Sequence, residues 1–152
     1  MAYNYLLLIH SWLRWAFLIA ALYAIVRSLN GKLGSKPFTK DDITAAKILI
    51  ALTHTMLLFG IILWFVSPNV QNALAQGAGV FMKDKYMRLI VLEHPLTNII
   101  AVAIIQIGRI KSKKAYEDAV KHNRSLMYYG LGLLLILSRI PWGTSPLFRG
   151  ME

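Results

Sequence analysis

The residues best suited to chemistry in this chain of 152 residues are four histidines, each in or beside a different apolar segment: His10, His54, His94 and His122. A titratable side chain inside a membrane is costly, and it usually faces a partner group or a cavity. A neutral imidazole is also a common axial ligand of haem iron. For any single histidine, the alternative is a polar contact between two helices. The choice depends on whether the segments bring the histidines together in pairs.

The apolar segments have the length of membrane-spanning helices, for which about 20 largely apolar residues are needed. They cover residues 3–26, 48–66, 89–108 and 123–142, and the fourth reaches this length only by including its polar ends. The chain is 57% hydrophobic, and its mean hydropathy is +0.51. We therefore predict an all-α fold, an integral membrane four-helix up-down bundle that forms a single domain over residues 1–152.

The connections between these segments carry turn and capping signals. Thr39 or Asp41 is expected to cap the second helix. Residues 67–85 form the longest connection, and its mildly apolar middle predicts a short helix at the membrane interface. Close contacts between helices are expected at the glycines inside the spans, because small residues let two helix backbones approach: Gly60, Gly130 and Gly132.

Basic residues predict the orientation in the membrane. The net charge is +10, and most of the Lys and Arg residues lie in the first and third connections, residues 27–47 and 109–124. The positive-inside rule places these connections in the cytoplasm and both termini outside it. Because the basic residues flank apolar segments, they indicate a lipid bilayer as the partner and not a nucleic acid.

His10 and His94 are expected to lie at the same depth. Counted from the start of each span, the helical rise of about 1.5 Å per residue places them roughly 10 Å and 9 Å below the outer boundary. They belong to alternate helices, which can be diagonal in a four-helix bundle. The inner pair matches less well, because His54 lies roughly 9 Å inside the inner boundary and His122 at or just outside it.

Arginines near the outer end are candidates for holding an anion. Arg14 follows His10 by four residues and therefore shares its helical face. Either a haem propionate or the carboxylate of Glu93 would balance this charge, and Arg139 is a candidate for the same role. Glu93 either balances an arginine or carries protons. Pro95 lacks an N–H and so frees a carbonyl group one turn earlier, which predicts a kink.

Several classes of chemistry are not expected. The chain has no cysteine, which excludes disulfides, cysteine-ligated iron–sulfur clusters and covalent haem attachment. We find no nucleophile with a base and an orienting group, no glycine loop for phosphate and no paired-carboxylate site. If the protein takes part in an enzyme, the expected role is that of an electron-transfer component of an oxidoreductase.

Two short motifs, HSWLRW at residues 10–15 and EHP at residues 93–95, occur together with one histidine for each helix. In these features the chain resembles small bacterial four-helix membrane proteins of the cytochrome b type. The architecture is also similar to the haem-binding core of the cytochrome b-561 class. This resemblance implies haem b at one or two sites, the outer between His10 and His94 and the inner between the other two histidines.

Three functions are compatible with these patterns. The first is a b-type cytochrome that transfers electrons, alone or as a subunit of a redox complex, with a quinone or a redox protein as its partner. The second is a non-haem accessory or assembly subunit of a membrane complex, or a homo-oligomer, in which the histidines form hydrogen bonds between helices. The third is a small proton-linked transporter that uses Glu93. We favour the first.

Overall fold

The computed structural model describes residues 2–142, and these residues form helices and short connections without any strand. Four helices are long: α1 (Ala2–Leu33), α2 (Lys40–Val66), α6 (His94–Lys113) and α7 (Asp118–Ser138). The connection from α2 to α6 contains α3 (Pro68–Ala75), α4 (Ala78–Phe81), α5 (Lys85–Arg88) and a π-helical turn, η1 (Leu89–Glu93). The predicted all-α class is confirmed, and a helix forms in the longest connection as expected.

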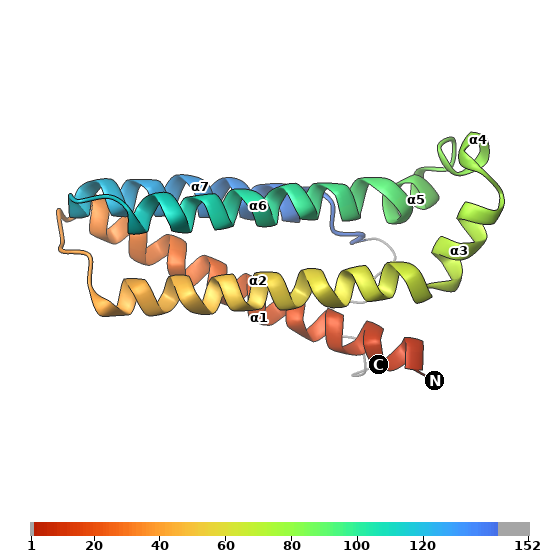
Figure 1. Cartoon of the computed structure of the whole chain (residues 1–152), viewed down its shortest axis with the longest axis horizontal. Coiled ribbons are helices and arrows are strands. Elements are labelled where there is room, and N and C mark those ends of the chain that lie inside the picture. Colours follow the sequence, from red (N-terminus) through yellow and green to blue (C-terminus); the bar gives the residue numbers. More distant parts are fainter. Residues whose placement is uncertain (1, 143–152) are drawn as a thin grey trace.

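The long helices run in alternating directions along the molecule (Figure 1). Each packs against two others, because α1 contacts α2 and α7, and α6 contacts the same two helices. Helices α1 and α6 therefore lie diagonally across the group. A core of buried side chains joins all four helices, with Phe17, Leu49, Ile105, Tyr129 and Ile136 among its members.

Three helical segments are long and apolar enough to cross a membrane: Ala2–Leu33, Lys40–Val66 and Lys85–Lys113. Each extends beyond the apolar span predicted from the sequence. Large hydrophobic side chains such as Ile19 and Leu58 are exposed on their outer faces, which suits a lipid environment. Helix α7 is not among the three, because its first turns contain polar residues between Asp118 and Ser125.

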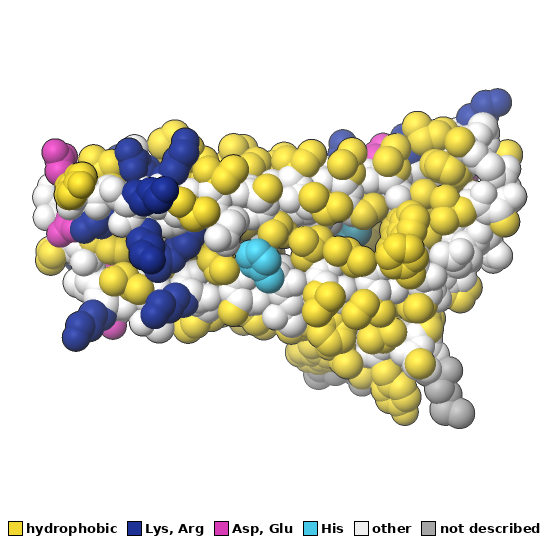
Figure 2. Space-filling model, viewed as in Figure 1, with side chains coloured by type: hydrophobic (Ala, Val, Ile, Leu, Met, Phe, Trp, Pro, Cys, Tyr) yellow, Lys and Arg dark blue, Asp and Glu magenta, His cyan; other side chains and the backbone are white. Residues whose placement is uncertain are grey.

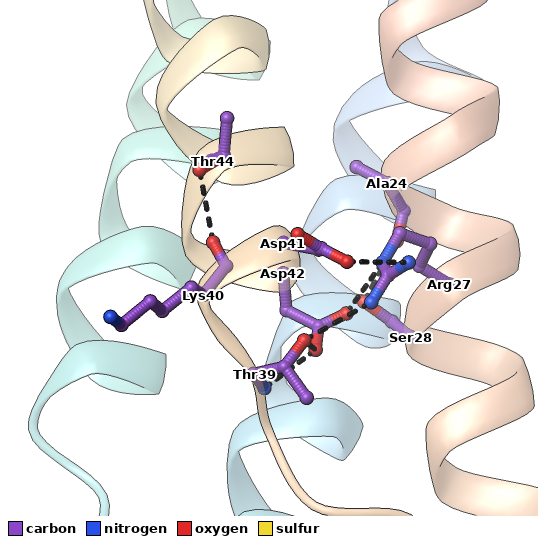
Figure 3. A network of polar contacts seen from close by, with 8 residues as sticks. All are labelled: Ala24, Arg27, Ser28, Thr39, Lys40, Asp41, Asp42 and Thr44. Carbon is purple, nitrogen blue, oxygen red and sulfur yellow. Dashed lines mark hydrogen bonds and ion pairs between the residues drawn. The ribbon is translucent and has the colours of Figure 1, made fainter.

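The start of α2 is joined to α1 by a polar network (Figure 3). Thr39 occupies the N-cap position of α2, which is one of the two predicted alternatives. The Asp42 carboxylate accepts hydrogen bonds from the Thr39 N–H at 2.8 Å and from the Thr39 hydroxyl at 2.9 Å. Arg27 Nε of α1 donates to the same carboxylate at 2.8 Å. The Asp41 carboxylate is exposed and lies 3.9 Å from Arg27. Asp42 therefore both caps α2 and connects it to α1.

We expect Asp42→Ala to destabilise the protein by about 2–3 kcal/mol. The change leaves the Arg27 guanidinium and the Thr39 N–H without their acceptor, and the cost stays below that of a fully buried pair because Arg27 is 28% exposed. Thermal unfolding in detergent, followed by helical circular dichroism, measures the change. Asp41→Ala is the matched control and should cost less than about 0.5 kcal/mol, since exposed ion pairs contribute little. Equal losses of stability in both variants would contradict the role of Asp42 in capping α2 and connecting it to α1.

Candidate functional site

A cavity of about 790 Å³ lies between the first half of α1, the second half of α2 and the first turns of α6. Most of its lining is apolar, as expected for side chains between membrane-type helices. The polar groups that reach it include His10, Ser11, Arg14, His94 and Asn98. The presence of these polar groups in an apolar cavity makes it the principal candidate for a binding site.

His10 and His94 line this cavity from the two diagonal helices, α1 and α6. His10 Nδ1 is buried and has no hydrogen-bond partner among the described residues. Gly60 of α2 lies behind this ring, because a Cβ atom at that position would be 3.4 Å from His10 Cε1. The expectation that two histidines of alternate helices face a common space is therefore met by this pair.

The ring of His94 is held in one orientation by α7. Its Nδ1 lies 2.7 Å from the carbonyl oxygen of Arg139, so this nitrogen must carry the proton and donate it. The Asn98 amide nitrogen is 3.1 Å from the same Nδ1, and it donates instead to the His94 carbonyl oxygen at 2.6 Å. The opposite ring nitrogen, Nε2, is therefore the unprotonated one and can act as a ligand.

The backbone next to His94 departs from the regular α-helix. The His94 N–H bonds to the Leu89 carbonyl, five residues earlier, which closes the π-helical turn η1. Pro95 has no N–H for the Val91 carbonyl, and this oxygen accepts a hydrogen bond from Trp64 Nε1 of α2 at 2.9 Å. The carbonyl group predicted to be freed by Pro95 is thus used to join α2 to the start of α6. Such π-turns inside helices often occur at functional sites.

Arg14 places a positive charge at the cavity. Its side chain is buried, with 5% of the residue exposed, and its Nη2 lies 3.4 Å from Ser11 Oγ. The guanidinium carbon lies 5.6 Å from the centre of the Trp15 ring and 5.9 Å from that of Trp142, within the range of cation–π contacts. A buried cation in this position attracts a negatively charged group of any ligand that enters the cavity.

The side chain of Arg139 forms an ion pair. It pairs with the Glu93 carboxylate at 3.7 Å, and Arg88 pairs with the other oxygen at 2.8 Å. Glu93 is one of the two predicted partners of Arg139. Because the Glu93 carboxylate pairs with Arg88 and Arg139, it is directed away from Arg14. At the cavity, Arg139 acts through its backbone carbonyl and His94.

The structure does not bring His54 and His122 together. His54 is exposed on α2, and its Nδ1 bonds to the Ile50 carbonyl of its own helix at 2.9 Å. His122 is buried beside Phe38 and lines a separate, smaller cavity of about 290 Å³. Since α2 and α7 start at the same end, the helical rise places His54 about 21 Å and His122 about 6 Å from that end. The inner pair implied by the resemblance is therefore not formed among the described residues.

Some groups of this site were not found by sequence reasoning. Asn98 follows His94 by four residues and so shares its helical face, which was a usable signal. The hydrogen bond of Trp64 to the Val91 carbonyl depends on how α2 packs. The sequence does not indicate that the Arg139 carbonyl is the acceptor, because every residue has a backbone carbonyl group.

No group of three or more His, Asp or Glu side chains that could hold a metal ion occurs in residues 2–142. Axial ligation of haem iron needs only two such groups. Comparison with models of protein families, with curated proteins and with solved structures found no match to this chain. The geometry of the cavity is therefore the available indication of a function.

Proposed function

We propose that the protein is a b-type haem-binding membrane protein that transfers electrons, with one haem held between His10 and His94. The observation that carries this proposal is the position of the two histidines, which line one cavity from diagonal helices. Its volume of about 790 Å³ is within the range of about 300–1,000 Å³ typical of cofactor sites.

The residues around the cavity fit such a group. His94 donates its Nδ1–H to a backbone carbonyl, which is the usual outer contact of a metal-binding histidine. His10 has a buried nitrogen without a hydrogen-bond partner among the described residues, and its ring lies against Gly60. Arg14 would balance the charge of a propionate. When bound, the haem iron supplies one-electron chemistry, and the apolar lining excludes water and influences its reduction potential.

The proposed membrane arrangement is an up-down bundle of four spans, with α7 as the fourth, in a bacterial inner membrane. Lys and Arg side chains gather toward the end of the molecule that carries the α1–α2 and α6–α7 connections (Figure 2). The positive-inside rule favours a cytoplasmic position for this end. Both termini and the His10–His94 cavity then lie toward the outer face, where a quinone or a redox protein would exchange electrons with the haem.

A second candidate is a non-haem accessory or assembly subunit. It is favoured by the hydrogen bond of His94 to the Arg139 carbonyl and by the Glu93–Arg139 ion pair, which together connect the start of α6 to the end of α7. In that case His94 would serve helix packing, and the exposed apolar faces would contact other subunits.

We expect one haem per chain when the protein is purified in mild detergent after expression with added haem. Oxidised and dithionite-reduced spectra should show a Soret band and sharp reduced α and β bands, because two histidine ligands give a low-spin b-type centre. Haem content is measured against protein concentration. A folded protein without haem would contradict the proposal and favour the accessory subunit. Two haems per chain would contradict the single site.

A further inference from the structure

The smaller cavity lies at the opposite end of the molecule from the His10–His94 cavity. It is bordered by the end of α1, the α1–α2 connection, the start of α2 and the first turns of α7, and His122 lines it together with Arg27, Lys36 and Asp42. Neither His10 nor His94 reaches it, so its role is independent of the proposed haem site.

His122 is the unexplained group of this cavity. It is only 1% exposed, yet neither of its ring nitrogens has a hydrogen-bond partner among the described residues. One face of the ring lies against Gly31, where any Cβ atom would overlap it, and Phe38 packs against it with ring centres 4.9 Å apart. A buried N–H without an acceptor is unfavourable. The ring therefore requires a group in the cavity that accepts its hydrogen bond.

The charges around the cavity favour an anion as this group. Arg27 and Lys36 contribute two positive charges to the lining, and Asp42 contributes one negative charge. The Asp42 carboxylate already accepts hydrogen bonds from Arg27 and Thr39 (Figure 3). Asp41, which is exposed and lies outside the lining, is also 3.9 Å from Arg27. Arg27 is therefore balanced by carboxylates, and Lys36 supplies the excess positive charge of the lining.

Further charges lie just outside the lining, on α7. The Lys121 ammonium donates to Asp118 at 2.7 Å and lies 5.8 Å from the centre of the Phe38 ring. The hydrogen bond from Lys121 holds the pKa of the Asp118 carboxyl below its usual value, so this carboxylate stays paired. Lys121 and Asp118 thus offset each other, and the excess positive charge of the lining is not cancelled from this side.

We propose that this cavity binds the phosphate group of an anionic phospholipid, with His122 and Lys36 as its hydrogen-bond donors. The cavity lies at the end of membrane-type helices where the basic side chains gather (Figure 2), a position typical of sites for anionic headgroups. Exposed apolar side chains nearby on α1 and α2, Leu29, Leu33 and Ile43, would contact the acyl chains. An inorganic phosphate offers the same anionic chemistry without these apolar contacts.

The first test compares Lys36→Gln with Lys32→Gln in the full chain. Both remove one exposed positive charge, but only Lys36 lines the cavity. We measure retained phosphatidylglycerol by native mass spectrometry after extraction from phosphatidylcholine nanodiscs that contain phosphatidylglycerol. Lys36→Gln should weaken retention about fivefold, the contribution of one basic residue near an anionic headgroup, and Lys32→Gln should leave it unchanged. Equal effects of the two changes would overturn the site.

The second test removes the ring nitrogens of His122 with His122→Leu. Neither nitrogen has a hydrogen-bond partner among residues 2–142, so the variant loses no hydrogen bond there and its melting temperature in pure phosphatidylcholine should not fall for that reason. The increase in melting temperature caused by phosphatidylglycerol should disappear. An unchanged increase would show that the lipid stabilises the protein without His122 and overturn the proposal. Loss of haem from this variant would instead make His122 a haem ligand and also overturn it. Equal stabilisation by inorganic phosphate, with no retained lipid, would overturn the lipid as the source.

Discussion

Replacing His10 with alanine should remove nearly all haem from the purified protein, and His94→Ala should do the same. Each change would remove one of the two proposed haem ligands, and no other histidine lines the cavity among residues 2–142. The two variants differ in what else they lose. His94→Ala also breaks the hydrogen bond to the Arg139 carbonyl, whereas His10 Nδ1 makes no hydrogen bond that could be lost. His10→Ala is therefore the cleaner test.

The measurement is haem per chain from the reduced spectrum, combined with helical circular dichroism to establish that each variant is folded. His54→Ala is the matched control, because His54 is exposed and bonds only to its own helix. It should keep the spectrum of the unmodified protein. If His10→Ala is folded and retains a full complement of haem, the proposed ligand pair is wrong. If His54→Ala loses haem, the iron is held elsewhere.

Gly132→Ala should destabilise the contact between α6 and α7, whereas Gly130→Ala in the same helix should not. A Cβ atom at Gly132 would overlap the Ile105 side chain and lie 3.3 Å from the Ala101 carbonyl oxygen. The same atom at Gly130 would meet nothing within 4 Å. Overpacking of a well-packed interface typically costs about 1–3 kcal/mol. At Gly130, alanine should stabilise the helix by about 0.5–1 kcal/mol, because it lowers the backbone entropy lost on folding.

Unfolding in mixed micelles of mild detergent and dodecyl sulfate, followed by circular dichroism, measures both changes. The pair keeps helix, residue type and substitution constant, so any difference in unfolding free energy reports the contact with α6. A shift of the same sign and size in both variants would contradict the packing of Gly132 against Ile105.

A large part of the architecture was predictable because it depends on local features. Apolar segments of sufficient length produce the helices, and three of these are confirmed as long and apolar enough to span a membrane. The rise per residue is the same in every helix, so the similar depths expected for His10 and His94 required no knowledge of the packing. The four-residue spacing of His10 and Arg14 likewise places both side chains on one face, and both line the cavity.

The groups around His94 depended on the tertiary structure. Its ring is oriented by a backbone carbonyl 45 residues away, and no side-chain type identifies such an acceptor. The choice of Arg139 and Arg88 as partners for Glu93 also depends on which helix ends meet. The sequence contained suitable charges for both alternatives, and only their distances selected between them.

The histidines and glycines show the same division. Residue type and helical rise alone predicted which side chains are suited to ligation and how deep they lie, because both are properties of a single helix. Only the packing decided that His10 and His94 share a cavity while His54 is exposed and His122 is enclosed elsewhere. It also decided that Gly132 and not Gly130 faces α6. The reason is that rotation of a helix about its axis is determined by its neighbours, and rotation controls which side chains meet.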